Sequence, residues 1–184
     1  MIDEFGYFPN NKAFVLPSSD WYLLGVLNTS LVTEYLRETC SQLLGGVVEF
    51  RAIYMEKLPI PNSSSTDQQA IGNLAQQTQT LHTQRRQRVE KFLRSLGTSP
   101  AESSSRNPLE QPWALKPEEF TKRAKHAPLQ LFLDARDETA SLTEEITRIE
   151  REIDERVAAL YGVPLDPNQG PQITGWESEP RPFA

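Results

Sequence analysis

The sequence has few of the residues on which catalytic and metal sites usually depend. Its 184 residues include one cysteine, Cys40, and two histidines, His82 and His126. One cysteine cannot form an internal disulfide, and these three residues lack the spacing of a zinc site. No glycine-rich phosphate-binding loop is present. We therefore expect no enzyme activity, cofactor or metal on this chain, and we expect Cys40 to be a buried apolar side chain in a reducing compartment.

Long hydrophobic runs are also missing. No apolar run approaches the roughly 18 residues of a membrane-spanning helix, and the acidic N-terminal segment lacks the apolar stretch of a signal peptide. We therefore expect a soluble, cytoplasmic protein with no membrane partner. The net charge of −6 argues against a general polyanion binder. It still allows a local basic patch, because exposed charges are screened beyond roughly 8–10 Å.

The N-terminal part has the pattern of a small lobe. Apolar and β-branched residues predict short strands over 13–16 and 47–51. Leucines at helical spacing over 21–40 predict either two helices that meet near Asn28 or one helix that bends there, because the polar residues there favour helix caps. A short helix or turn follows over 52–58. The residues that reverse or stop the chain form a predicted structural joint: Gly45, Gly46, Pro59 and Pro61.

Two long helices follow. The first is predicted from Ser65, which with Gln68 fits a capping box, to a stop at Gly97. The second is predicted to begin near Leu129–Asp134 and to stop at Gly162-Val163-Pro164. Its apolar residues recur at steps of three and four, which is typical of a narrow coiled-coil seam. The seam residues are Leu142, Ile146, Ile149, Ile153, Val157 and Leu160.

Together these patterns predict an α+β fold that is mostly α. A small lobe over 1–61 with short strands and helices precedes a long antiparallel helical hairpin over 62–163. A Pro- and Ser-rich connection at 97–117 joins the two helices, and we expect the Pro-rich tail over 164–184 to be disordered. Burying six Leu, Ile or Val side chains contributes roughly 10 kcal/mol before chain entropy is subtracted, so the hairpin must dock on something or form a homodimer.

The basic run "RRQRVEKFLR" at 85–94 has two interpretations. It could be a phosphate-contacting helix face. Alternatively, its cations face the acidic residues of the last helix, or water, and we favour this second interpretation because Glu90 lies inside the run.

The order of motifs resembles a known family. "SSDWYLLGVLNTSLVTEYL", "LLGGVVEFRAIYMEKLPIPN", a capped long helix, "PWALKPEEF" and "EIDERVAALYGV" follow one another. This order, over residues 3–163, is similar to the C-terminal target-recognition region of adenine-specific DNA methyltransferases and fused Type II restriction–modification enzymes. The resemblance implies a non-catalytic module that recognises double-stranded DNA and works with an upstream methyltransferase domain or subunit. No motif of adenine methylation is present on this chain.

For contact with DNA bases or phosphates, the candidates are charged or amide side chains near the turns of the presumed lobe: Asn11, Lys12, Arg37, Arg51 and Lys57. Arg51 and Lys57 have an alternative role as partners of Glu49 or Glu56. The acidic Glu49 departs from the family pattern, in which this position is often polar or basic. The alternative function is a helical protein-interaction or dimerisation module that does not bind DNA.

Overall fold

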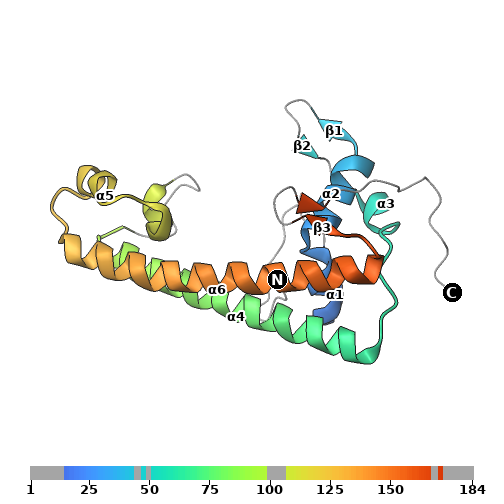
Figure 1. Ribbon diagram of the computed structural model, residues 1–184. Coiled ribbons are helices and arrows are strands. Elements are labelled where there is room, and N and C mark those ends of the chain that lie inside the picture. The colour runs from blue at the N-terminus through green and yellow to red at the C-terminus, as the bar shows by residue number, and fades with distance from the viewer. Residues whose placement is uncertain (1–14, 44–46, 49–50, 99–106, 167–169, 172–184) are drawn as a thin grey trace. The chain divides into compact units, whose positions relative to one another are not determined.

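The computed structural model describes residues 15–43, 47–48, 51–98, 107–166 and 170–171 (Figure 1). Within these ranges the protein is predominantly helical. The helices are α1 (Trp21–Leu27), α2 (Ser30–Thr39), α3 (Ala52–Met55), α4 (Ser65–Ser95), α5 (Pro117–Arg123) and α6 (Leu129–Tyr161), with short 3₁₀ turns at Pro108–Glu110 and Pro112–Ala114. The chain divides into two compact units: unit 1 comprises residues 1–76 and 150–184, and unit 2 comprises residues 77–149.

The predicted α+β class is wrong. Extended structure in the described ranges consists of two-residue pairs, β1 (Gln42–Leu43) with β2 (Val47–Val48) and β3 (Leu165–Asp166) with β4 (Gly170–Pro171). Such pairs are too short to form a sheet with a face that helices could cover. Val15 and Leu16, at the end of the first predicted strand, are not extended partners of any described segment, and residues 13–14 and 49–50 lie outside the described ranges. The β-branched residues of the predicted strands favour extended structure, but among the described residues no strand pairs with them over more than two residues.

In unit 1, the predicted break near Asn28 is confirmed. Asp20 caps α1 by accepting hydrogen bonds from the backbone N–H groups of Tyr22 and Leu23. Asn28 ends α1, and the hydroxyl of Thr29 accepts from the backbone N–H of Val32 at the start of α2. Both helices direct apolar side chains inward, and the buried hydrophobic residues of this region are Tyr22, Val26, Leu31, Val32, Leu36 and Cys40.

The first turns of α4 lie very close to α1. A Cβ atom on Gly25 would approach Cγ2 of Ile71 to 2.7 Å, and a Cβ atom on Gly72 would lie 3.3 Å from Cβ of Trp21. Ile71 is only 1% exposed, so it has little space into which it could move. The two glycines therefore permit a backbone approach that any larger residue at position 25 would prevent.

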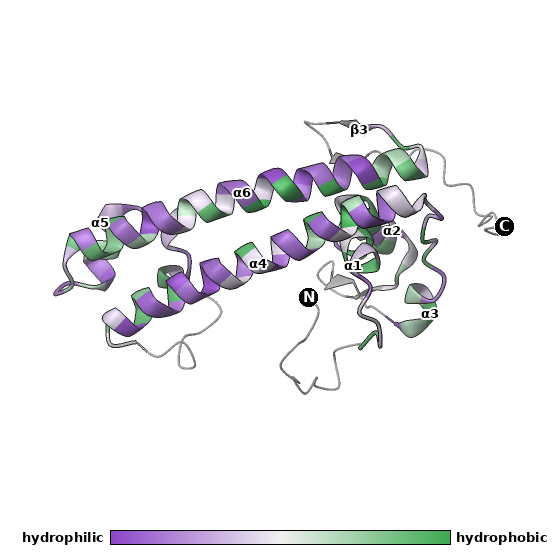
Figure 2. Ribbon diagram, turned by 90° about the horizontal axis from the view of Figure 1, so that it is seen from below, coloured by the Kyte–Doolittle hydropathy of each residue, from purple (hydrophilic) through white to green (hydrophobic). Residues whose placement is uncertain are grey.

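In unit 2, α4 and α6 run antiparallel and side by side (Figures 1 and 2). Arg85 on α4 donates to Thr143 on α6, and Arg88 on α4 forms an ion pair with Glu138 on α6. The later residue on α4 thus contacts the earlier residue on α6, as expected for antiparallel helices. Figure 2 shows narrow hydrophobic bands on otherwise hydrophilic helices. This pattern means that each helix depends on burying one face.

The predicted seam residues are divided between the units. Ile146 and Ile149 are buried in unit 2, and Ile153 and Val157 are buried in unit 1. Leu142 and Leu160, the first and last members, are half-buried. The seam positions therefore face protein most completely at the centre of the repeat.

The end of the hairpin in unit 2 is closed by an aromatic cluster. Phe120 on α5 stacks on Phe132 of α6 with ring centroids 4.6 Å apart, and Phe92 of α4 lies 6.0 Å and 6.4 Å from these two rings. All three phenylalanines are at most 2% exposed. Val89, Leu93 and Leu115 complete this buried cluster. The cluster joins α4, α5 and α6 into one core.

The ends of the long helices follow the predicted signals closely. Gly97 and Gly162 have φ values of 71° and 68°, which is the left-handed conformation expected just after a helix. The next residue in each case donates back to the last turn, Thr98 to Leu93 and Val163 to Ala158. At the start of α4, the capping side chain is Ser64 rather than the predicted Ser65, and Asp67 is its partner.

We predict that Gly25→Ala destabilises the protein by about 1–3 kcal/mol, because the added methyl overpacks the contact with Ile71. Urea unfolding followed by circular dichroism measures this change. Asn73→Ala, an exposed position on the neighbouring turn of α4, is the control and should change stability by roughly 0.5 kcal/mol or less. A Gly25→Ala protein as stable as the wild type would contradict the close approach.

Candidate functional site

The predicted DNA-contact residues in the described ranges lie on two elements of unit 1. Arg37 is exposed in the last turn of α2 and forms an ion pair with Glu34 at 3.2 Å. Arg51 is the exposed N-cap residue of α3, and Lys57 is exposed just after that helix. The structure thus places all three on the surface. Asn11 and Lys12 lie outside the described residues.

The predicted joint is anchored by two tyrosines that the sequence reasoning did not identify. Pro59 and Pro61 are buried, and their carbonyl oxygens accept hydrogen bonds from the hydroxyls of Tyr161 and Tyr22, respectively. The Tyr22 bond is 2.7 Å long. Because Tyr22 belongs to α1 and Tyr161 to the end of α6, the segment between α3 and α4 is held from both sides. Gly45 and Gly46, the other predicted joint residues, lie outside the described residues.

A carboxylate from α6 supplies a third connection within unit 1. The backbone N–H of Ser30, the first residue of α2, donates to Oδ1 of Asp154 at 2.9 Å. The first N–H groups of a helix have no partner within the helix, and an anion also interacts favourably with this end of the helix dipole. Asp154 therefore caps α2 from a position 124 residues away in the sequence.

Burial changes the titration of both anchoring tyrosines. Desolvation raises the pKa of Tyr161 above its ordinary value of 10.0, and the neighbouring Tyr22 and Tyr35 raise it further. Desolvation also raises the pKa of Tyr22, although Ser63 opposes this and Asp20 and Asp67 add to it. Both hydroxyls therefore remain protonated and able to donate at any neutral pH.

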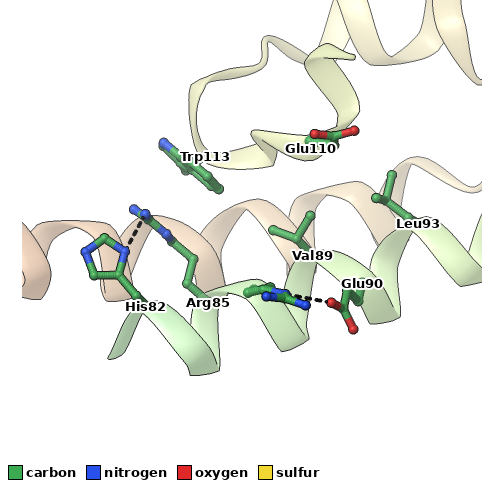
Figure 3. A pocket seen from close by; sticks show the side chains of 8 residues that line it. His82, Arg85, Val89, Glu90, Leu93, Glu110 and Trp113 are labelled. Atoms are coloured by element: carbon green, nitrogen blue, oxygen red, sulfur yellow. Dashed lines mark hydrogen bonds and ion pairs between the residues drawn. The ribbon is translucent and has the colours of Figure 1, made fainter. Parts of the chain in front are cut away.

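In unit 2, a groove of about 430 Å³ lies between α4 and the 3₁₀ turns (Figure 3). The guanidinium of Arg85 stacks on the ring of Trp113 at 4.5 Å. It also donates to Thr143 at 3.0 Å and lies 3.1 Å from Nδ1 of His82. These contacts explain how a charged residue is accommodated on the apolar stripe of α4: its charge faces an aromatic ring and polar oxygen and nitrogen atoms.

The other side of the groove carries a carboxylate. Oε1 of Glu110 is buried and has no hydrogen-bond partner among the described residues. Val89 and Leu93 line the groove between Glu110 and the Arg85 side. A bound group with an N–H donor could satisfy Glu110, so the groove has the chemistry of a small polar recognition site.

Most cations of the basic run on α4 face acidic or polar neighbours. Arg86 and Arg94 both pair with Glu90, and Arg88 pairs with Glu138 of α6. Of these, Arg88 pairs with an acidic residue of the last helix, whereas Arg86 and Arg94 pair within α4 and Arg85 contacts Thr143, His82 and Trp113. In the described ranges, no group of three or more His, Cys, Asp or Glu side chains could hold a metal ion.

No helix in the described part of the chain is both long and apolar enough to cross a membrane. The model of one protein family, described as Domain of unknown function (DUF8810), matches residues 64–157. That range begins just before α4 and ends within α6, so it contains the aromatic cluster and the groove. It covers slightly more than half of the chain. Comparisons with curated proteins and with solved structures found no match.

We predict that Tyr161→Phe changes how stability depends on pH. Because the folded-state pKa of Tyr161 is raised, its contribution is complete below about pH 10 and is lost as the pH rises towards the folded-state pKa. At pH 8 the variant should be about 1–2 kcal/mol less stable, since the carbonyl of Pro59 loses its donor. Above about pH 10 the wild type should lose stability with rising pH more steeply than the variant, by up to about 1.4 kcal/mol per pH unit for this proton.

Urea unfolding at a series of pH values measures both effects. Tyr22→Phe should act in the same direction, because the pKa of Tyr22 is also raised. The double variant should then have the flattest profile. If the curves of wild type and Tyr161→Phe run parallel above pH 10, the pKa of the buried hydroxyl is not raised in the folded state.

Proposed function

The chain belongs to the family described as Domain of unknown function (DUF8810), and we propose that it is a non-catalytic DNA sequence-recognition module of a restriction–modification system. In this role it binds double-stranded DNA and works with an upstream methyltransferase domain or subunit, which performs the chemistry in the cytoplasm. The chain itself contributes binding and carries no catalytic residue.

The observation that carries the proposal is the exposure of Arg37, Arg51 and Lys57 on a lobe that is anchored at several points. Recognition of a DNA sequence requires protein side chains at defined positions, because base edges and phosphates have fixed geometry. The hydrogen bonds that Tyr22 and Tyr161 donate, and the one that Asp154 accepts from Ser30, restrain the elements next to these cations. The order of sequence motifs, which resembles target-recognition regions, supports the same role.

A second candidate function is protein interaction or dimerisation without DNA binding. Val15, Leu16 and Ile53 in unit 1 are 66%, 51% and 54% exposed. Large apolar side chains at this level of exposure are suited to a protein contact. The acidic residues of the same lobe also offset its cations, which is less favourable for binding a polyanion.

We predict that the full chain binds short duplex DNA and that binding weakens steeply as salt rises. Fluorescence anisotropy with a labelled duplex, measured from about 50 to 200 mM salt, gives the slope of log K against log salt. Substituting Gln for Arg37, Arg51 and Lys57 together should reduce this slope by about 0.9 for each phosphate that the variant no longer neutralises. Selection from a random duplex pool should enrich one motif with the wild type.

A matched control removes three exposed cations from α6 by substituting Gln for Arg148, Arg151 and Arg156. This control changes the net charge equally and should leave the salt slope unchanged. If the wild type retains no DNA at about 50 mM salt and sediments as a concentration-dependent dimer, the proposal fails and the second candidate is favoured.

A further inference from the structure

A basic cluster lies at the turn between α5 and α6 in unit 2. It consists of Lys122, Arg123, Lys125 and His126, which we term the turn cluster, and all four side chains are exposed. Residues 120–128, "FTKRAKHAP", contain no acidic residue, although the whole chain has a net charge of −6. The turn cluster is therefore a local exception to the charge of the protein.

The backbone of the turn is fixed from the inside. Phe120 is 1% exposed in the aromatic cluster, and Ala124 and Ala127 pack against the same core. The backbone N–H of Ala124 donates to Phe120, and that of Ala127 donates to Ala124. Since the apolar residues of this segment face inward, the intervening cations project outward from a restrained frame. A ligand that binds them does not need to order the backbone first.

Helix stability explains only part of the cluster. Lys122 and Arg123 are in the last turn of α5, where cations interact favourably with the helix dipole. Lys125 and His126 follow the end of that helix, so the dipole does not account for them.

The turn cluster forms no ion pair among the described residues, although Glu118 and Glu119 lie one turn earlier on α5. Lys122, Lys125 and His126 have no ion pair or hydrogen bond among the described side chains, and Arg123 donates to the backbone oxygen of Glu119 at 3.5 Å. The basic run on α4 is different, because Arg86, Arg88 and Arg94 pair with carboxylates. The cations of the turn cluster thus retain their capacity to bind an external anion.

We propose that the turn cluster binds phosphate groups of the DNA backbone and forms a second contact, separate from the candidate residues of the lobe. This inference rests on the proposed function. Duplex DNA is favoured over other anions because it presents closely spaced phosphates, about one charge per 1.7 Å of helix axis, to several neighbouring cations. Such a contact adds affinity and position but carries no sequence information.

The test substitutes Gln for Lys122, Arg123 and Lys125 together and uses the full chain. Anisotropy with duplex DNA should give weaker binding and a salt slope reduced by about 2–3, or about 0.9 for each cation removed. The motif selected from a random duplex pool should stay the same, because phosphate contacts weaken all sequences nearly equally. The α6 triple variant at Arg148, Arg151 and Arg156 is again the matched control. Thermal unfolding should show only a small decrease in the melting temperature for both variants, since the substituted side chains are exposed and lose at most a helix-dipole interaction or a surface ion pair.

The outcomes separate this inference from the proposed function. If the wild type binds DNA, the lobe variant weakens binding and the turn-cluster variant keeps the wild-type slope, then the turn-cluster inference is wrong and the proposed function survives. If the wild type does not bind DNA, both are wrong. Binding of the wild type to anionic lipid vesicles but not to DNA would also overturn the inference and would identify a membrane surface as the ligand.

Discussion

The structure depends on one constraint: α4 and α6 are long helices with a single apolar face, and neither can bury that face alone. In unit 2 the solution is the aromatic cluster of Phe92, Phe120 and Phe132, which joins three helices. In unit 1 it is a close approach of α4 to α1, which Gly25 and Gly72 permit. Both solutions bury the apolar stripe and leave the polar faces exposed.

The same constraint determines which charges remain available. Cations beside the buried stripe of α4 lie near carboxylates or polar groups, and Arg85, on the stripe itself, is covered by Trp113 and Thr143. Among the described residues, the cations at the turn before α6 form no ion pair, and Arg123 contacts only the backbone oxygen of Glu119. The run with the highest density of arginines is therefore less suited to bind an anion than the shorter basic segment after α5, because availability depends on counter-charges and not on residue counts.

Several elements could be predicted from local signals. Glycines at positions 97 and 162 end the long helices where expected, and polar residues at 28 and 29 separate α1 from α2. The strands could not be predicted correctly, because β propensity expresses packing against neighbouring strands that the described part of this chain does not supply. The anchoring tyrosines were also missed: Tyr161 bonds to a carbonyl 102 residues away, and no local pattern identifies such a partner.

By itself, the sequence determined the helices, their ends and the inward positions of α6, since caps, glycines and apolar spacing act over a few residues. Only the tertiary structure decided the helical class, the anchoring of the Pro59–Pro61 segment and the capping of α2 by Asp154. It also decided which cations are paired. The physical reason is that these features depend on distances between residues far apart in the chain, and such distances follow from the packing of apolar faces rather than from residue order.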